Sequence, residues 1–306
     1  MARLRPLVLL GLVAVVAVGA LLVLVPAARA RLANDPERGS ASTSPSPGRA
    51  NVAMQAAPPP PTLRAAPVTT PAGMYLFGWA LLDLHTGTMV GSANRDTVTN
   101  TTESMVKAWL AADYLRRLGP KQPTQQALSD ITLMIEDSND QMADKYYNLD
   151  GGPVAIQRLI ATCKLTHTSL GQSWSYTEIT PADAARYGRC VGTGVAAGAT
   201  WTQWLLDKMR HVRGTVKDQI SKTKQGGRWG IIDGLPASLA QAAAIKNGWT
   251  YIYADARWHI NCMAILPDSV LAVEMQFAGS QTSKGLQVGA DACASVARQL
   301  VYAPEV

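Results

Sequence analysis

The order of secondary-structure patterns along residues 73–306 constrains the fold most strongly. Short apolar runs bordered by turn residues, which are typical of strands, lie at both ends of this region. Three- and four-residue apolar spacing, which is typical of helices, fills the middle. We therefore expect an α+β fold, in which the N- and C-terminal parts share one antiparallel sheet flanked by helices. A helical lobe would be inserted between the two parts. Strands are expected at 74–84, 89–93, 242–245, 258–266 and 270–277, and helices near 105–115, 127–135, 153–163, 181–187, 201–212 and 290–301.

Residues 1–30 are predicted to be a targeting segment. Arg3 and Arg5 precede an unbroken apolar run at residues 7–25. About twenty apolar residues can span a bilayer, so the run favours an uncleaved anchor with its N-terminus in the cytoplasm. The small residues of Ala28-Arg29-Ala30 keep a cleavable signal peptide open as the alternative. Under either hypothesis the remainder is extracytoplasmic, tethered to the membrane through this segment or secreted.

Residues 31–72 are predicted to be a disordered linker. Serine, threonine and proline alternate between Ser40 and Ser46, and four prolines run from Pro58 to Pro61. Such a stretch cannot bury enough apolar surface to become ordered. The predicted catalytic or binding domain therefore spans residues 73–306.

The distribution of charge argues against a nucleic-acid partner. Residues 1–72 hold 7 of the 28 lysines and arginines and 2 of the 22 aspartates and glutamates, so residues 73–306 carry 21 basic and 20 acidic side chains. A nucleic-acid-binding domain gathers basic side chains on its folded part. The one basic group there is interpreted as a solvated loop, and it consists of Lys217, Lys222, Lys224 and Arg228.

The four cysteines predict two disulfides. An even number of cysteines in an exported chain indicates disulfide pairing, with three connectivities open. Proximity along the chain favours Cys163 with Cys190 and Cys262 with Cys293. A zinc site would need cysteines a few residues apart, and these are not. We find no other metal motif and no nucleotide-binding loop, so no cofactor is expected.

Ser104 and Lys107 form a candidate nucleophile and base. If Ser104 opens a helix, Lys107 lies one turn further along the same face, within reach of the hydroxyl. Serine attacks a carbonyl only when a base takes its proton. The positive end of the helix dipole would lower the pKa of the lysine. A second pair, Ser221 and Lys224, lies in a polar stretch without a helical apolar face and is interpreted as a loop.

Two further elements follow this pair in order. Ser138-Asn139-Asp140 comes after a predicted helix, and Lys246-Asn247-Gly248 lies at the start of a C-terminal strand. Taken alone, Ser138 reads as an ordinary helix-end residue, and Lys246 reads as a residue at a strand edge.

The order of the three elements resembles the S-x-x-K, S-D-N and K-T-G motifs of the penicillin-recognising serine hydrolases, namely β-lactamases and D-Ala-D-Ala peptidases. The resemblance covers residues 73–306. It implies that Ser104 is the nucleophile, Lys107 the base and Ser138 a proton relay. It further implies that the segment Lys246-Asn247-Gly248-Trp249, together with Asp140, binds the substrate. The Trp249 and Ser104 N–H groups would bind the oxyanion. Supporting matches are Asp83-Leu84, Gly151-Gly152, Ile179-Thr180-Pro181 and Trp229-Gly230, and Lys-Asn-Gly-Trp resembles exported actinobacterial serine hydrolases.

Three departures from the family pattern shape the expected function. Asp140 stands in place of an asparagine, and Asn247 in place of a threonine or serine. No glutamate suited to deacylation precedes Pro181, because Glu178 is too close to it. We therefore expect an exported acyl-serine hydrolase that acts on β-lactams or peptidoglycan stem peptides and releases its acyl group slowly. The alternative is a catalytically impaired module that binds the cell wall or a partner.

The histidines are not expected to act in catalysis. His85 lies in a predicted turn, and His167 and His211 belong to no recognisable triad. His259 lies within a predicted strand and is interpreted as a packing or sheet-edge residue.

Overall fold

The structure, a computed structural model, describes residues 59–219 and 226–303. The predicted targeting segment, most of the predicted linker, and the Ser221 and Lys224 pair lie outside the described residues. Within the described ranges, no helix is both long and apolar enough to cross a membrane.

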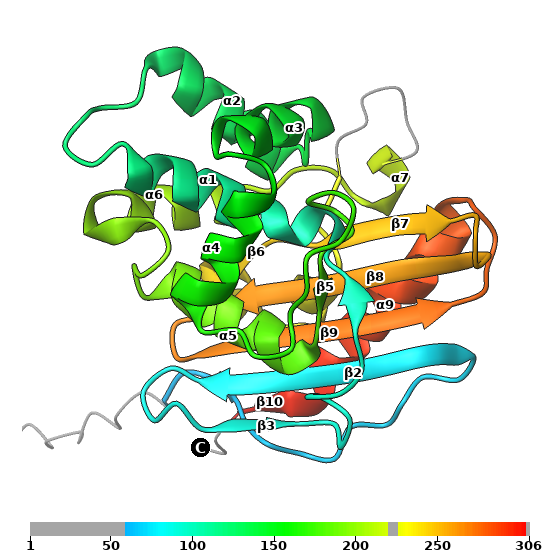
Figure 1. The fold of residues 1–306 in the computed structure, drawn as a ribbon. Coiled ribbons are helices and arrows are strands. Elements are labelled where there is room, and N and C mark those ends of the chain that lie inside the picture. Colours follow the sequence, from blue (N-terminus) through cyan, green and yellow to red (C-terminus); the bar gives the residue numbers. More distant parts are fainter. Residues whose placement is uncertain (1–58, 220–225, 304–306) are drawn as a thin grey trace, which may run out of the picture. The chain divides into compact units, whose positions relative to one another are not determined.

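The centre of the domain is an antiparallel sheet of six strands. Its strand order is β3-β2-β9-β8-β6, with β7 also paired to β8 (Figure 1). Strand β2, from the N-terminal part, pairs with β9, from the C-terminal part, along its whole length. The two ends of the domain therefore share one sheet, as predicted. The strands are β2 (Met74–Asp83), β3 (Met89–Gly91), β6 (Ala244–Ile245), β7 (Gly248–Ile252), β8 (Arg257–Ile265) and β9 (Ser269–Phe277).

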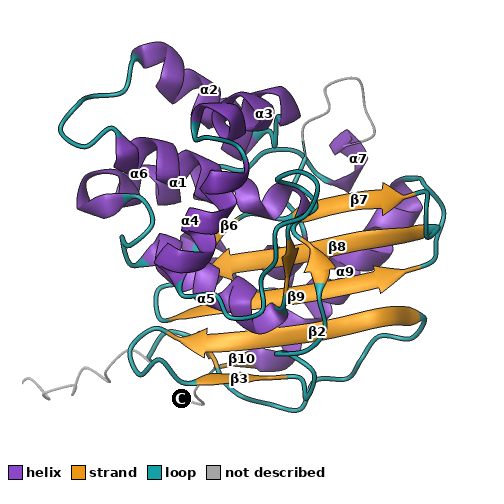
Figure 2. Ribbon diagram, viewed as in Figure 1, coloured by secondary structure: helices purple, strands orange, loops and turns teal. Residues whose placement is uncertain are grey.

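Helices cover both faces of this sheet (Figure 2). The helical lobe inserted between β2 and β9 contains α1 (Lys107–Arg117), α2 (Gln125–Glu136), α3 (Asp140–Leu149), α4 (Pro153–Cys163), α5 (Pro181–Gly192) and α6 (Gly198–Arg210). The opposite face packs against α9 (Ser283–Leu300). Helix α3 was not predicted, because its sequence is mostly polar and buries only two side chains. The shorter elements are β4 (Asn100–Thr101), β5 (Glu178–Ile179), α7 (Val216–Gln219), η2 (Gly230–Gly234) and α8 (Ala237–Ala242).

Alternation along the strands divides the apolar side chains between two cores. On β2, Ala80 and Leu82 join the core of the helical lobe, whereas Trp79 and Leu81 join the core under α9. Successive side chains of a strand point to opposite faces, so a strand covered on both sides is apolar at every position. These strands therefore appear in the sequence as continuous apolar runs.

One disulfide lies in the helical lobe, and the other joins the sheet to α9. Both predicted pairings are confirmed. Cys163 at the end of α4 is joined to Cys190 in α5, with 5.3 Å between their Cα atoms. Cys262 in β8 is joined to Cys293 in α9, with 6.4 Å between their Cα atoms. Each closes a loop of about thirty residues, which by chain entropy stabilises the fold by about 3–4 kcal/mol.

The ordered chain begins earlier than the predicted boundary at residue 73. Strand β1 (Thr62–Leu63) pairs with β10 (Val301–Tyr302) after the end of α9. The Thr69 N–H also donates to Gln299 Oε1 at 2.8 Å. These residues fall inside the range 31–72 for which the sequence predicts disorder. The prediction is wrong for this part of the range, because the pairing partner lies at the other end of the chain.

Candidate functional site

Ser104 lies on a short 3₁₀-helix, η1 (Glu103–Val106), that leads directly into α1. The Thr102 and Glu103 N–H groups donate to the Thr177 and Ser175 carbonyls at 2.7 and 2.9 Å. Glu103 has a φ of 48°, which is rare for a residue with a side chain. Hydrogen bonds from a distant segment, which contains Ser175 and Thr177, therefore hold this turn in its conformation. Side chains three residues apart eclipse one another in a 3₁₀-helix, which brings Lys107 directly to Ser104.

The Lys107 amine is the centre of the candidate site. Nζ lies 2.8 Å from Ser104 Oγ, 2.5 Å from the Ser138 carbonyl oxygen and 2.6 Å from Asp140 Oδ1. The side chain is fully buried, and this burial lowers the pKa of Lys107, while the Asp140 carboxylate opposes the shift. A neutral amine can accept the Ser104 proton while its two N–H groups keep donating to the other two oxygens.

The Ser138-Asn139-Asp140 segment is shaped by the start of α3. The Asn139 side chain caps this helix by accepting a hydrogen bond from the Met142 N–H at 3.0 Å. Ser138, just before the cap, has a φ of 58°. This conformation brings the Ser138 hydroxyl within 3.4 Å of Lys107 Nζ. Asp140 is the first residue of α3, and its side chain is 77% exposed. Its negative charge therefore both pairs with Lys107 and faces the cleft.

Lys246 lies between β6 and β7 and contacts the same Ser138 hydroxyl as Lys107. Its Nζ donates to Ser138 Oγ at 2.9 Å, so hydrogen bonds connect Ser104, Lys107, Ser138 and Lys246 without a break. Complete burial, together with the positive charge of Lys107, lowers the pKa of Lys246 well below its usual value. An arriving carboxylate would favour the charged form.

Gly248 allows β7 to lie directly against the nucleophile turn. A Cβ atom at this position would be 2.2 Å from the Thr102 carbonyl oxygen and 2.9 Å from the Met105 nitrogen. No side chain fits there, which explains the glycine in the motif. The next residue, Trp249, lines the cleft and packs edge-on against Trp229, with ring centroids 5.3 Å apart. Oxyanion binding by the Trp249 and Ser104 N–H groups stays a prediction.

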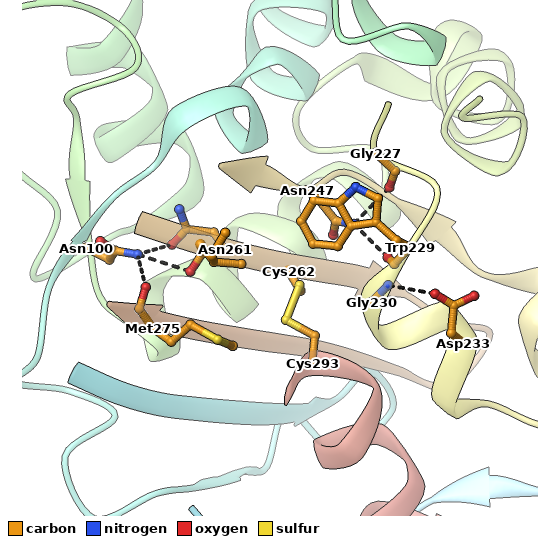
Figure 3. Close-up of a disulfide and its surroundings, with 11 residues drawn as sticks. Asn100, Gly227, Trp229, Gly230, Asp233, Asn247, Asn261, Cys262, Met275 and Cys293 are labelled. Atoms are coloured by element: carbon orange, nitrogen blue, oxygen red, sulfur yellow. Dashed lines mark hydrogen bonds between the residues drawn. A yellow bond between two sulfur atoms is a disulfide. The ribbon is translucent and has the colours of Figure 1, made fainter. Parts of the chain in front are cut away.

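The Asn247 side chain, which was predicted to contact substrate, donates its hydrogen bonds inside the protein. Asn247 Nδ2 donates to the Gly227 and Trp229 carbonyl oxygens, both at 2.8 Å. The residue is 1% exposed, and Figure 3 shows its amide turned toward the segment that carries Trp229. Buried carbonyls need donors, and an amide nitrogen supplies two. Asn247 therefore supports this segment and does not face the cleft.

The cleft in front of Ser104 has a volume of about 680 Å³. One wall comes from the loop between α4 and β5, where Trp174, Ser175 and Tyr176 line it. The Trp174 ring lies 5.1 Å from Lys107 Nζ, and its N–H donates to Asp144 at 2.8 Å. The sequence reasoning missed this wall, although a tryptophan within a loop rich in serine and threonine was a signal. The cleft is lined by Glu103, Ser104, Asp137, Ser138, Asn139, Asp140, Gln141, Trp174, Ser175, Tyr176, Gln219, Trp249 and Thr250.

Glu103 was also missed, although it directly precedes the candidate nucleophile. Burial raises the pKa of Glu103 to about 7, against the hydrogen bond that Thr101 donates to Oε1 at 2.7 Å. The Thr101 hydroxyl also lies 3.1 Å from His259 Nδ1. His259 is thus more than the packing residue that we expected, because it is hydrogen-bonded beside the site. By contrast, the Glu178 side chain is exposed, and its Oε2 accepts a hydrogen bond from the Ser169 hydroxyl at 3.4 Å.

No family model matches the chain. Among curated proteins, the chain is similar to "Putative lipoprotein LppW" of Mycobacterium tuberculosis and Mycobacterium bovis, with 26% identity over 199 residues. The matched part covers 62% of this chain and 59% of the relative. The chain therefore spans less than two thirds of the length of these curated relatives.

Solved structures identify the fold. TLA-3 extended-spectrum β-lactamase is 15% identical and superposes with a TM-score of 0.55, over 72% of this chain and 91% of that one. PBP-A is 15% identical, with a TM-score of 0.53 over 76% and 90%. A β-lactamase from Chitinophaga pinensis is 14% identical, with a TM-score of 0.55 over 74% and 91%. The chain has the fold of serine β-lactamases and penicillin-binding proteins, as the motif order predicted.

Proposed function

We propose that this protein is an exported acyl-serine hydrolase of the penicillin-recognising type. Its substrates would be β-lactams or peptidoglycan stem peptides. The observation that carries the proposal is the position of Lys107 Nζ, 2.8 Å from Ser104 Oγ in a buried site that lowers the pKa of the amine. Such an amine is suited to take a proton from serine.

The hydrogen-bonded chain supplies the groups that acylation needs. Lys107 takes the Ser104 proton, and Oγ attacks the carbonyl carbon of the substrate. Ser138 then passes a proton from Lys107 to the leaving nitrogen, since its hydroxyl lies between Lys107 and Lys246. Lys246 attracts the substrate carboxylate. We expect release of the acyl group to be slower than in a class A β-lactamase, because the glutamate before Pro181, Glu178, is exposed and does not line the cleft.

Three observations support export. Residues 7–25 are apolar throughout, and two disulfides join the cysteines of the domain. Disulfides persist in oxidising compartments outside the cytoplasm. The curated relatives are named as lipoproteins. Fractionation of cells that express the full chain would test this point, and recovery of the protein from the cytoplasm would contradict it.

Covalent labelling tests the catalytic proposal. Full-length protein with intact disulfides is treated with a fluorescent penicillin, and intact mass measures the adduct. We expect one adduct per molecule on Ser104 and none on Ser104→Ala. As a matched control, Ser129→Ala changes a serine of α2 away from Ser104 and should label like the wild type. An adduct on folded Ser104→Ala would contradict the nucleophile assignment.

A second candidate function is a module that binds cell wall or a partner without turnover. The observation that favours it is the altered recognition side of the site. Asp140 presents a negative charge to the cleft, and the Asn247 amide is occupied inside the protein. This function predicts peptidoglycan binding that persists in Ser104→Ala, measured by co-sedimentation with purified cell wall. Binding that is lost in that folded variant would contradict it.

A further inference from the structure

Three hydrogen bonds lead from the surface end of β8 to the residue before Ser104. Asp255 Oδ2 lies 2.8 Å from His259 Nε2, and His259 Nδ1 lies 3.1 Å from Thr101 Oγ1. Thr101 Oγ1 lies 2.7 Å from Glu103 Oε1. The Asp255 side chain is 32% exposed, whereas that of His259 is 7% exposed. These contacts therefore connect solvent to a buried carboxyl group.

The four groups admit two arrangements that contain the same number of protons. In the first, Glu103 is ionised and accepts a hydrogen bond from Thr101. His259 is then doubly protonated and donates to both Thr101 and Asp255. In the second, Glu103 is protonated and donates to Thr101, which donates to a neutral His259. Every hydrogen bond is satisfied in both arrangements, so a proton can pass between Glu103 and His259 through the hydroxyl.

Glu103 lies beside the candidate nucleophile, where a group that accepts a proton from water could serve hydrolysis. It precedes Ser104 in the same 3₁₀ turn, and both residues line the cleft. The charged groups that act on it are the Lys107 amine from α1 and the Asp140 carboxylate from α3, while His259 reaches it through Thr101. The pKa of Glu103, raised to about 7 by burial, lets the carboxyl gain or lose a proton near neutral pH.

We propose that Glu103 is the base for hydrolysis of the acyl group from Ser104. Thr101 and His259 then carry the accepted proton to solvent. This inference rests on the proposed acyl-serine hydrolase function and adds to it the deacylating group that the sequence reasoning did not find. Glu103 is the catalytic residue in this step, and Thr101 and His259 are positioning residues.

Deacylation consumes one water molecule. The oxygen of a water molecule bonds to the acyl carbon, and one water proton passes to the Glu103 carboxylate. The bond between the acyl carbon and Ser104 Oγ breaks, and Oγ takes the second proton of the attacking water, which the neutral Lys107 amine passes on. The acyl group therefore leaves as a carboxylate, and Lys107 is neutral again. The proton on Glu103 leaves through Thr101 and His259, so the net products are free serine, a carboxylate and one proton.

The test separates adduct formation from adduct decay. Full-length protein is labelled with fluorescent penicillin, freed of reagent, and followed by intact mass at a series of pH values. We expect the decay rate of the wild type to rise with pH through about 7 and then level off. In Glu103→Gln the adduct should still form, but it should decay about 100-fold more slowly and without this pH dependence. Glu178→Gln, at an exposed carboxylate on β5, is the matched control and should decay like the wild type.

A second pair of variants examines the relay without changing Glu103. Thr101→Val keeps the shape of the side chain but removes the hydroxyl that lowers the pKa of Glu103. Its pH midpoint for decay should shift upward, and Thr101→Ser should restore the midpoint. An adduct that decays equally fast in wild type and Glu103→Gln would overturn this inference alone. A wild-type protein that forms no adduct would contradict the proposed function, and this inference with it.

Discussion

The two sides of the candidate site differ in how they use their motif residues. On the proton-transfer side, Lys107 contacts Ser104 and Ser138 just as their order in the sequence leads one to expect. On the recognition side, Asn247 occupies the motif position but donates into the body of the protein. The difference shows that a motif locates the backbone, whereas neighbouring segments decide where a side chain points.

The physical reason lies in the partners that each side chain meets. The Lys107 amine contacts oxygen atoms of Ser104 in η1, of Ser138 just before α3 and of Asp140 in α3, and all three residues line the cleft. Asn247 lies beside two main-chain carbonyls that would lose a donor if its amide turned away. An unpaired buried acceptor costs about 1–3 kcal/mol, which exceeds the gain from an exposed contact.

Replacing the buried amine should break the proton-transfer side and gives the largest expected effect. In Lys107→Met the rate of acylation should fall by about 1,000-fold, within the range of general base catalysis. Stopped-flow labelling with fluorescent penicillin measures this rate. Lys121→Met, at an exposed lysine, is the matched control, and circular dichroism verifies folding. Acylation at the wild-type rate in Lys107→Met would show that another group activates Ser104.

Removing the Asn247 amide should affect stability more than activity. Asn247→Ala leaves the Gly227 and Trp229 carbonyls without this donor and should lower the free energy of unfolding by about 1–3 kcal/mol. Urea denaturation measures the loss, with exposed Asn148→Ala as the control. The acylation rate should change little. If acylation fell tenfold while stability stayed constant, the two sides of the site would not differ as described.

Neutralising Asp140 tests the recognition side of the site and has the smallest expected effect of the three substitutions. Asp140→Asn removes a negative charge at the cleft, so acylation by a penicillin, which carries a carboxylate, should rise about 5- to 10-fold. The Asp140 carboxylate also raises the pKa of Lys107. Its removal lowers that pKa, so neutral amine persists to lower pH and the acidic limb of the acylation profile shifts downward. An uncharged ester should show the pH shift without the rate increase, and an unchanged profile would contradict this account.

Much of the fold followed from local patterns. The apolar runs of β2, β8 and β9 and the helices α2, α4 and α6 could be predicted, because periodicity reports which faces are buried. Helix α3 and strand β1 could not. The first is held by its cap and two buried side chains, and the second by a partner at the far end of the chain.

The candidate site divides in the same way. Ser104, Lys107, Ser138 and Lys246 carry recognisable motifs, and the structure joins them by hydrogen bonds. Glu103, Trp174 and His259 carry none. Their environments depend on segments far away in the sequence, as when Thr101 meets His259 across 158 positions.

The sequence by itself determined the α+β class, the order of the motif residues and the two preferred cysteine pairs. These features depend on local spacing and on residue types with few alternative roles. Only the tertiary structure decided that Asn247 faces inward, that Gly248 must lack a side chain and that Glu103 joins a chain of hydrogen bonds to Asp255. The physical reason is that hydrogen bonding and desolvation are set by whichever atoms folding brings within about 3 Å, and those atoms come from distant parts of the chain.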